Sequence, residues 1–330
     1  MRKARIIGTG STIPKRVLSN KDLESIVDTS DEWITRRTGI KQRHISSNSS
    51  EESTTGLASR ASIKALKMAG VCPEDLDMIV VGTVTPDLQF PSTACMLQEE
   101  LNAKNAAAFD VSAGCSGFLY ALGIVNNAIR CGSCRLALVV GVERLSSITN
   151  WQDRSTCVLL GDGAGAVVVG STTKHAGILS THLKSDGSLG KLLYSSEGKI
   201  RAPKILRNID LKPFHLKMEG NRLFKKAVAC LTSIAKEALQ QNSLFSKDVE
   251  LMIPHQANIR IIKAMADNLK IPADKVFINI HKYGNTSSAS IPIAMDEANQ
   301  QGLLVQGAHI LLVSVGAGLT WGASVLKWSM

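Results

Sequence analysis

The chain has 330 residues, of which 44% are hydrophobic and 4% aromatic, and its formal net charge is +10. This length provides a core large enough for two domain-sized units, and no apolar run approaches the roughly 18 residues that would indicate a membrane span. The positive charge favours an anionic partner. The basic residues are dispersed and form no nucleic-acid motif, so an acidic protein or a phosphorylated cofactor fits equally well.

The first residues resemble the basic start of a signal peptide, but the apolar stretch ends at Gly8, far too early for one. We therefore interpret Ala4–Gly8 as a first strand and predict a cytoplasmic protein. The seven cysteines are an odd number in a long chain, which predicts reduced thiols. Cys131 and Cys134 have no second pair beside them, so a structural turn is favoured over a metal or redox site, and we expect no metal.

Apolar, β-rich runs alternate with helical patterns along the rest of the chain. The predicted strands are Met78–Thr83, Ala107–Val111, Leu136–Val142, Ala164–Val169, Gly177–Leu183, Leu251–Ile253, Ile310–Val315 and Gly322–Lys327. The predicted helices are Glu52–Ala69, Ser92–Leu101, Cys115–Arg130, Asn221–Gln241, Ile259–Leu269 and Ser288–Gln300. Several strands are continuously apolar, which is typical of strands buried on both faces. The alternation predicts a layered α/β fold, with a long surface excursion at residues 187–215.

The two halves of the chain resemble each other. Helix and strand segments beginning at Lys64 and Asp75 have counterparts at Glu237 and Asp248, both at an offset of 173 residues. This offset predicts a duplicated α/β unit, with halves 1–172 and 173–330. Under this interpretation Cys115 and Asn285 begin equivalent helices, which a duplicated fold brings together.

Three residues suit thioester chemistry. Cys115, within Gly-Cys-Ser-Gly, lies where a strand gives way to a helix, and a helix start favours the thiolate and offers N–H donors. An inert buried cysteine is the alternative. His255 follows a short strand in Pro-His-Gln-Ala-Asn, where open α/β sheets place ligands, and a structural histidine that caps the next helix is its alternative. Asn285, in Gly-Asn-Thr-Ser, is by itself an ordinary helix cap.

Glycine clusters and Trp/Arg groupings are weaker signals. Residues 161–165 and 316–318 are glycine-rich but lead into strands, so tight turns explain them better than phosphate loops. Trp33 and Trp151 lie near arginines, an arrangement that suits adenine and phosphates and is equally compatible with a solvated surface.

The motifs together resemble the β-ketoacyl-[acyl-carrier-protein] synthase III family of thiolase-like condensing enzymes over nearly the whole chain. They are Ile-Ile-Gly-Thr-Gly at 6–10, Thr-Ser-Asp-Glu-Trp-Ile at 29–34, Arg-Thr-Gly-Ile at 37–40, Gly-Asp-Gly-Ala-Gly at 161–165, Pro-His-Gln-Ala-Asn at 254–258, Gly-Asn-Thr-Ser at 284–287 and Leu-Thr-Trp-Gly at 319–322. The resemblance implies a thiolase-like fold with duplicated halves in an αβαβα arrangement. It also implies a cytoplasmic homodimer that joins a short acyl-CoA, acetyl-CoA by first expectation, to malonyl-acyl carrier protein, with release of CoA and CO2 and without a cofactor.

The resemblance also implies a role for each matching position. Cys115 matches the nucleophile that becomes acylated, and His255 and Asn285 match the pair that promotes malonyl decarboxylation. The oxyanion hole corresponds to the backbone N–H groups of Cys115 and Ala317. The remaining matches are coenzyme A contacts at Thr29, Trp33, Arg37, Arg154 and Asn258, an acyl pocket at Phe90 and Val315, and carrier-protein docking at Lys225 and Arg260. Phe90 is expected to reach the pocket across the dimer interface.

One residue departs from the family, and several other readings remain open. Val315 stands where relatives often have Phe, which leaves the size of the acyl primer undecided. Elongating synthases pair the cysteine with two histidines, and Asn285 argues against that. Biosynthetic thiolases need a second catalytic cysteine near the C-terminus, and none lies beyond Cys230. Plant-type polyketide synthases share Cys, His and Asn but are usually longer. A papain-like protease also has Cys, His and Asn in this order, but its cysteine lies near the N-terminus in a Cys-Trp context. A module that binds coenzyme A without turnover is a further alternative.

Overall fold

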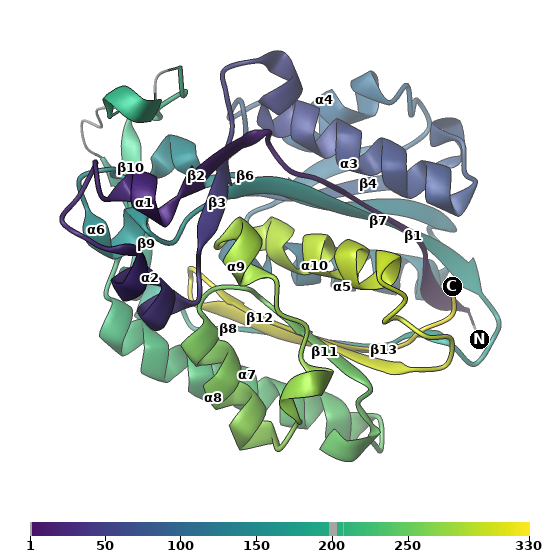
Figure 1. The fold of residues 1–330 in the computed structure, drawn as a ribbon. Helices are drawn as coiled ribbons and strands as arrows, with labels where there is room; N and C mark the ends of the chain where they lie inside the picture. Colours follow the sequence, from purple (N-terminus) through teal and green to yellow (C-terminus); the bar gives the residue numbers. More distant parts are fainter. Residues whose placement is uncertain (1, 198–202, 207) are drawn as a thin grey trace.

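The computed structural model describes residues 2–197, 203–206 and 208–330. Its helices and sheets form five layers, helix–sheet–helix–sheet–helix, as Figure 1 shows. The layered α/β arrangement predicted from the sequence is confirmed. No helix within the described ranges has both the length and the apolar character needed to cross a membrane.

The sheet of the N-terminal half has five strands in the order β1-β7-β6-β4-β5. They are β1 (Lys3–Thr12), β4 (Met78–Gly82), β5 (Ala107–Val111), β6 (Leu136–Arg144) and β7 (Asp162–Thr172). β4 runs parallel to both β5 and β6, whereas β7 is antiparallel to its neighbours β6 and β1. β6 and β7 are almost wholly buried, as their continuous apolar sequences predict.

The sheet of the C-terminal half has the order β11-β12-β13-β8. Its strands are β8 (Gly177–Ser185), β11 (Leu251–Pro254), β12 (His309–Gly316) and β13 (Thr320–Lys327). The chain passes from one sheet to the other between Thr172 and Gly177. The proposed division after residue 172 falls in this turn and stays a prediction, since one hydrophobic core includes buried residues of both halves.

Helices from both halves of the chain make up the three helical layers (Figure 1). α5 (Gly117–Cys131) and α10 (Ser290–Gln300) lie between the sheets, α3 (Thr54–Ala69) and α4 (Thr93–Glu100) cover the first sheet, and α7 (Gly220–Gln241) and α8 (Ile259–Leu269) cover the second. One cluster of buried apolar side chains surrounds the central helices and includes strands of both sheets, and two others fill the boundaries between the sheets and the outer helices. Burial of this apolar surface is the main stabilising contribution to the arrangement.

The duplication extends to the turns that precede the central helices. A 3-10 turn, η3 (Gly114–Ser116), leads into α5, and another, η9 (Ser287–Ala289), leads into α10. Both the turns and the helices begin 173 residues apart. The predicted equivalence of the two helices holds, but the residue equivalent to Cys115 is Ser288. Asn285 lies three residues earlier, on the approach to the turn.

Two segments form structure that the sequence patterns did not predict. Residues 13–50 contain β2 (Arg16–Ser19), α1 (Asn20–Leu23), α2 (Asp31–Thr38), β3 (Gln42–Ile45) and the start of η1 (Ser50–Glu52). The predicted excursion contains η5 (Gly187–Leu192), β9 (Leu193–Glu197), η6 (Lys204–Leu206) and the start of β10 (Phe214–Met218), and β9 pairs with β10 as a hairpin. Residues 198–202 and 207 of that segment lie outside the described residues.

The remaining short elements are α6 (Arg154–Cys157), α9 (Ile280–Tyr283), η2 (Pro73–Asp75), η4 (Leu145–Ile148), η7 (Ser246–Asp248) and η8 (Ala273–Lys275). α5 ends at Cys131, Gly132 takes a left-handed conformation, and β6 begins at Leu136. The prediction that Cys131 and Cys134 mark a structural turn between helix and strand is therefore confirmed.

Candidate active site

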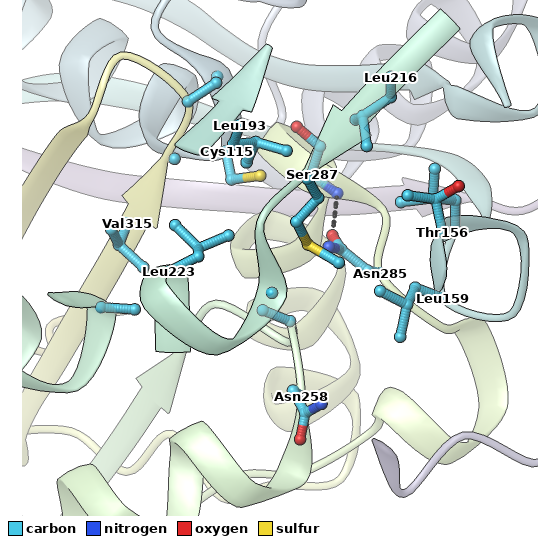
Figure 2. A pocket seen from close by; sticks show the side chains of 18 of the residues that line it. Cys115, Thr156, Leu159, Leu193, Leu216, Leu223, Asn258, Asn285, Ser287 and Val315 are labelled. Atoms are coloured by element: carbon cyan, nitrogen blue, oxygen red, sulfur yellow. Dashed lines mark hydrogen bonds between the residues drawn. The ribbon is translucent and has the colours of Figure 1, made fainter. Parts of the chain in front are cut away.

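Cys115, His255 and Asn285 line one cavity of about 1050 Å³. They come from three separate parts of the chain, namely η3, the end of β11 and the loop before η9. Figure 2 shows the sulfur of Cys115 beside Ser287, with Asn285 across from it. The structure therefore brings together the three side chains that sequence analysis selected.

Close contacts between backbones fix the position of Cys115. Gly114 has a φ of +54°, and a Cβ on it would lie 2.5 Å from the backbone nitrogen of Ala317. A Cβ on Gly316 would lie 2.3 Å from the backbone nitrogen of Cys115. Only glycine permits this approach. The Ser314 hydroxyl donates to the Cys115 carbonyl at 2.8 Å, so η3 is also tied to β12.

The Cys115 thiol differs from the prediction. The cysteine precedes α5, which begins at Gly117, so it lies in the 3-10 turn and not in the helix itself. The pKa of the thiol is raised to about 12, chiefly by burial and also by the nearby Glu143 carboxylate, while Ser287 acts in the opposite direction. The expectation that a helix start favours the thiolate stays a prediction, and burial acts against it.

His255 is a buried, neutral imidazole. Its backbone N–H donates to Val313 at 2.8 Å, which continues the pairing of β11 with β12. Only 5% of the residue is exposed, and burial lowers the pKa of the imidazole to about 3. The alternative of a helix cap does not apply, since Asn258 caps α8 by accepting a hydrogen bond from the Arg260 N–H. A neutral imidazole still has one N–H to donate.

Hydrogen bonds determine the orientation of the Asn285 amide. Its Oδ1 accepts a hydrogen bond from the Ser287 backbone N–H at 2.8 Å, the dashed line in Figure 2. Its backbone N–H donates to Leu159, and its carbonyl accepts from Gly161. Because Oδ1 faces an N–H donor, the NH2 group is the end left for another acceptor. Asn285 is not a helix cap, since Thr286 holds that place for η9.

The other predicted site residues fall into two groups. Those that line the cavity are Trp33, Arg37, Lys225, Asn258, Arg260, Val315 and Ala317. Arg154 contacts the site through Trp33: its guanidinium lies 4.8 Å from the centre of the ring, and that of Arg37 lies 5.5 Å away. Thr29 and Phe90 are not among the lining residues, and Phe90 is 85% exposed.

Several lining residues were not singled out from the sequence. Leu193 and Leu216 come from the β9–β10 hairpin, which borders the cavity. Ser287 ends the Gly-Asn-Thr-Ser motif and lies beside the Cys115 sulfur, as Figure 2 shows. No group of three or more His, Cys, Asp or Glu side chains in the described part of the chain is placed to hold a metal ion.

Comparisons with known proteins agree with this site. Residues 109–187 match the family model for 3-oxoacyl-[acyl-carrier-protein] synthase III, and residues 239–328 match the model for its C-terminal part. The chain is 53% identical over 326 residues to beta-ketoacyl-[acyl-carrier-protein] synthase III of Caldanaerobacter subterraneus, covering 99% of this chain and 98% of that protein. The synthase of the same name from Aquifex aeolicus is 50% identical over 325 residues, with 98% and 99% covered.

Comparison of the folds agrees with comparison of the sequences. The crystal structure of 3-oxoacyl-[acyl-carrier-protein] synthase III from Aquifex aeolicus superposes with a TM-score of 0.90 at 49% identity. The superposition covers 98% of this chain and all of that one. Such agreement over the full length leaves no room for a papain-like fold. The chain therefore belongs to the β-ketoacyl-[acyl-carrier-protein] synthase III family.

Proposed function

We propose that this condensing enzyme initiates fatty-acid synthesis by joining a short acyl group from acyl-CoA to malonyl-acyl carrier protein. In the first half-reaction the Cys115 sulfur attacks the acyl thioester and coenzyme A leaves. In the second, the malonyl group loses CO2 and the resulting enolate attacks the acyl-cysteine, giving a 3-oxoacyl-acyl carrier protein. The observation that carries this proposal is that Cys115, His255 and Asn285 line one cavity.

The two half-reactions call for two sets of hydrogen-bond donors. The backbone nitrogen of Ala317 lies against Gly114 and that of Cys115 lies against Gly316, so the two turns meet at these donors, which supports their assignment to the oxyanion formed on the acyl carbonyl. Neutral His255 and the free NH2 of Asn285 suit the enolate oxygen of the malonyl thioester. Because each half-reaction has its own hydrogen-bond donors, the same thiol can take part in both.

The nucleotide end of coenzyme A is assigned to the cluster around Trp33. Arg37 and Arg154 both lie over its ring, so one flat aromatic surface and two cations are in place for adenine and phosphates. Asn258 lies further along the cavity wall, and Thr29 belongs to the same N-terminal region. Coenzyme A is therefore a substrate here, and the scheme needs no resident cofactor.

We propose a cytoplasmic homodimer. The side chains of Leu88 and Phe90 are 52% and 85% exposed on the loop after β4, an arrangement that favours cover by a second subunit. Phe90 does not line the cavity of its own chain. A second copy is what would place it against an acyl pocket, as the family resemblance implies.

Exposure to acetyl-CoA followed by mass spectrometry of the protein tests the proposal directly. We expect a single acetyl group, located on the peptide that contains Cys115. A label on another cysteine, or coenzyme A bound without acyl transfer, would contradict it, and the second outcome would favour a binding module.

Val315 is expected to relax selectivity among short primers. It is 7% exposed, lines the cavity, and is smaller than the Phe often found in relatives. Each extra methylene that fits is worth about 0.8 kcal/mol when buried. We expect Val315→Phe to lower kcat/KM for butyryl-CoA more than for acetyl-CoA. An unchanged ratio would move primer selection to Phe90 or the β9–β10 hairpin.

Lys225 on α7 and Arg260 on α8 are expected to bind the acidic carrier protein. Both are exposed at the cavity, and the net charge of +10 favours an acidic partner. Reversal to Glu at either position should raise KM for malonyl-acyl carrier protein, most strongly at low salt. Acetyl transfer from acetyl-CoA should change little.

Lys236→Glu is the matched control, because Lys236 is exposed on α7 but does not line the cavity. It alters the net charge by the same amount and should leave KM for the carrier protein nearly unchanged. An equal rise in KM for Lys236→Glu would show a general charge effect instead of a docking site.

A further inference from the structure

Arg43 is a buried arginine whose guanidinium joins three separate points of the chain. It lies on β3 and is 0% exposed. Its Nη1 donates to the Leu18 carbonyl at 3.1 Å, and its Nη2 donates to Asn20 Oδ1 at 2.9 Å and to the Val158 carbonyl at 2.8 Å. All three acceptors are uncharged oxygens. Burying a charge on neutral partners is costly, so the contribution of Arg43 lies in what these three bonds hold in place.

The Val158 carbonyl is one residue away from the backbone that holds Asn285. The Asn285 N–H donates to the Leu159 carbonyl at 2.8 Å, and the Gly161 N–H donates to the Asn285 carbonyl at 2.9 Å. Residues 159–161 and Asn285 therefore pair as a short parallel bridge. Asn285 belongs to the loop between α9 and η9, so the place of its side chain depends on this pairing.

The stem of the Arg43 side chain packs against both segments of the bridge. A Cβ on Gly161 would lie 3.1 Å from Arg43 Cβ, and a Cβ on Gly284 would lie 3.2 Å from it. The same glycines let the two segments approach. The Cβ on Gly161 would lie 2.3 Å from the Tyr283 carbonyl oxygen, and that on Gly284 would lie 2.8 Å from the Leu159 carbonyl oxygen. Arg43 therefore contacts the bridge with its stem and holds one side of it with its guanidinium.

Asn20 connects the same guanidinium to the helix that carries coenzyme A residues. It is 1% exposed, and its Oδ1 is the acceptor for Arg43. Its Nδ2 donates to the Ile40 carbonyl at 2.7 Å and to Asp31 Oδ1 at 2.8 Å. Asp31 begins α2, on which Trp33 lies. Because the Nδ2 bonds do not involve Arg43, α2 keeps this attachment when the guanidinium is replaced.

A purely structural role is the alternative, because the guanidinium also attaches the segment of residues 13–50 to the rest of the protein. Loss of such an attachment would disturb both half-reactions alike. Cys115 is held separately, by Ser314 and Gly316 on β12. The two roles therefore differ in whether acyl transfer to Cys115 is kept when the guanidinium is lost.

We propose that Arg43 is a positioning residue for Asn285. Its guanidinium holds the Val158 carbonyl, and thereby the backbone that pairs with Asn285, so that the free NH2 of Asn285 meets the enolate oxygen of the malonyl thioester. This inference rests on the proposed function, in which Asn285 serves the malonyl step. Arg43 does not line the cavity and takes part in no bond change. A displacement of about 1 Å can cost a rate about 100-fold, which lets a residue outside the cavity control the step.

Arg43→Lys is the variant that tests the proposal. Lysine keeps the charge and a long stem, but its single ammonium group does not reproduce the planar fork that reaches three acceptors. We expect release of labelled CO2 from malonyl-acyl carrier protein to fall about tenfold or more. Acetyl transfer to Cys115, measured at saturating acetyl-CoA, should change by less than about twofold, because the turn that holds the thiol is fixed elsewhere.

A double variant with Arg43→Lys and Asn285→Ala shows whether Arg43 acts through Asn285. Residues that act as a unit have strongly non-additive effects. Once the Asn285 amide is gone, Arg43 has no donor left to position, so CO2 release should match that of Asn285→Ala alone within about twofold. A merely structural Arg43 would lower the rate further, by about the factor it costs on its own.

Arg144→Lys is the matched control, because it makes the same change at another buried arginine. Arg144 is 6% exposed and donates to the Ser47 carbonyl, which lies outside the bridge of residues 159–161 with Asn285. The ratio of CO2 release to acetyl transfer should stay at its native value. An equal fall of this ratio in both variants would show a general response to the loss of a buried guanidinium and would overturn the proposal.

Hydrogen exchange measures the loop without any substrate. The N–H groups of Asn285 and Gly161 should exchange slowly in the native protein and about tenfold faster or more in Arg43→Lys. The N–H of His255, which donates to Val313 within the sheet, should change less. An equal rise at all three would report a general loss of stability and would contradict the positioning role.

Native CO2 release in Arg43→Lys would overturn the proposal, as would equal losses in the two half-reactions or a further fall in the double variant. Rapid exchange of the Asn285 N–H in the native protein would overturn it even if the variant did not fold. A malonyl step that is insensitive to Asn285→Ala would reject the role given to Asn285 in the proposed function. Sensitivity to Asn285→Ala without sensitivity to Arg43→Lys would reject the Arg43 inference alone.

Discussion

Cys115→Ser is expected to abolish acyl transfer from acetyl-CoA and, with it, condensation. The variant replaces one atom in a site whose backbone is fixed by Gly114 and Gly316, so the fold should be kept. A serine hydroxyl is a far weaker nucleophile than a thiolate at neutral pH and has no general base assigned to it here. The residual rate should fall below detection in an assay that follows transfer of labelled acetyl groups to protein.

Cys95→Ser is the control for this result. Cys95 is also half-buried, but its sulfur donates to the Ala108 carbonyl and it does not line the cavity. It should keep full acyl transfer, and the Cys115→Ser protein should still bind coenzyme A through the Trp33 cluster. Acetyl groups recovered on Cys115→Ser at the native level would remove Cys115 from its assigned role.

The parts of the fold that the sequence predicts are those with regular apolar patterns. The continuous apolar runs of β6 and β12 and the helical period of α7 and α8 are determined by burial within the five layers. The segment that contains α2 and β3 was missed because its elements are short and held by tertiary contacts. In it, Arg43 is fully buried and donates to the Leu18 and Val158 carbonyls, an arrangement that no local pattern reveals.

In the site, too, local sequence patterns predict some features, whereas others depend on contacts between distant parts of the chain. Cys115, His255 and Asn285 each stand in a turn beside glycine or proline, so the sequence marks them as ends of elements. The offset of 173 residues even places α5 and α10 together. The environment of the thiol could not be predicted, because it depends on Glu143 and Ser287, which are 144 residues apart in sequence and meet only in the folded protein. Desolvation is a property of the packed interior.

His255→Ala and Asn285→Ala are each expected to lower malonyl decarboxylation by about 100-fold or more, the effect of losing an oxyanion donor. Acyl transfer to Cys115 should survive better, because the donors assigned to that step are the backbone N–H groups of Cys115 and Ala317, which neither substitution removes. Since the pKa of His255 is lowered to about 3, the imidazole stays neutral between pH 5 and 9. The decarboxylation step should therefore show no histidine titration in that range.

Asn285→Asp provides the sharper comparison, because it preserves the shape of the side chain. Its carboxylate can still accept the hydrogen bond from the Ser287 N–H that Oδ1 accepts now. It replaces the NH2 donor by an anionic oxygen facing the enolate, so decarboxylation should fall further than in Asn285→Ala. The measurement is release of labelled CO2 from malonyl-acyl carrier protein, beside acetyl transfer by the same preparation. Variants that lost acetyl transfer and kept CO2 release would show that the two donor sets have been assigned to the wrong half-reactions.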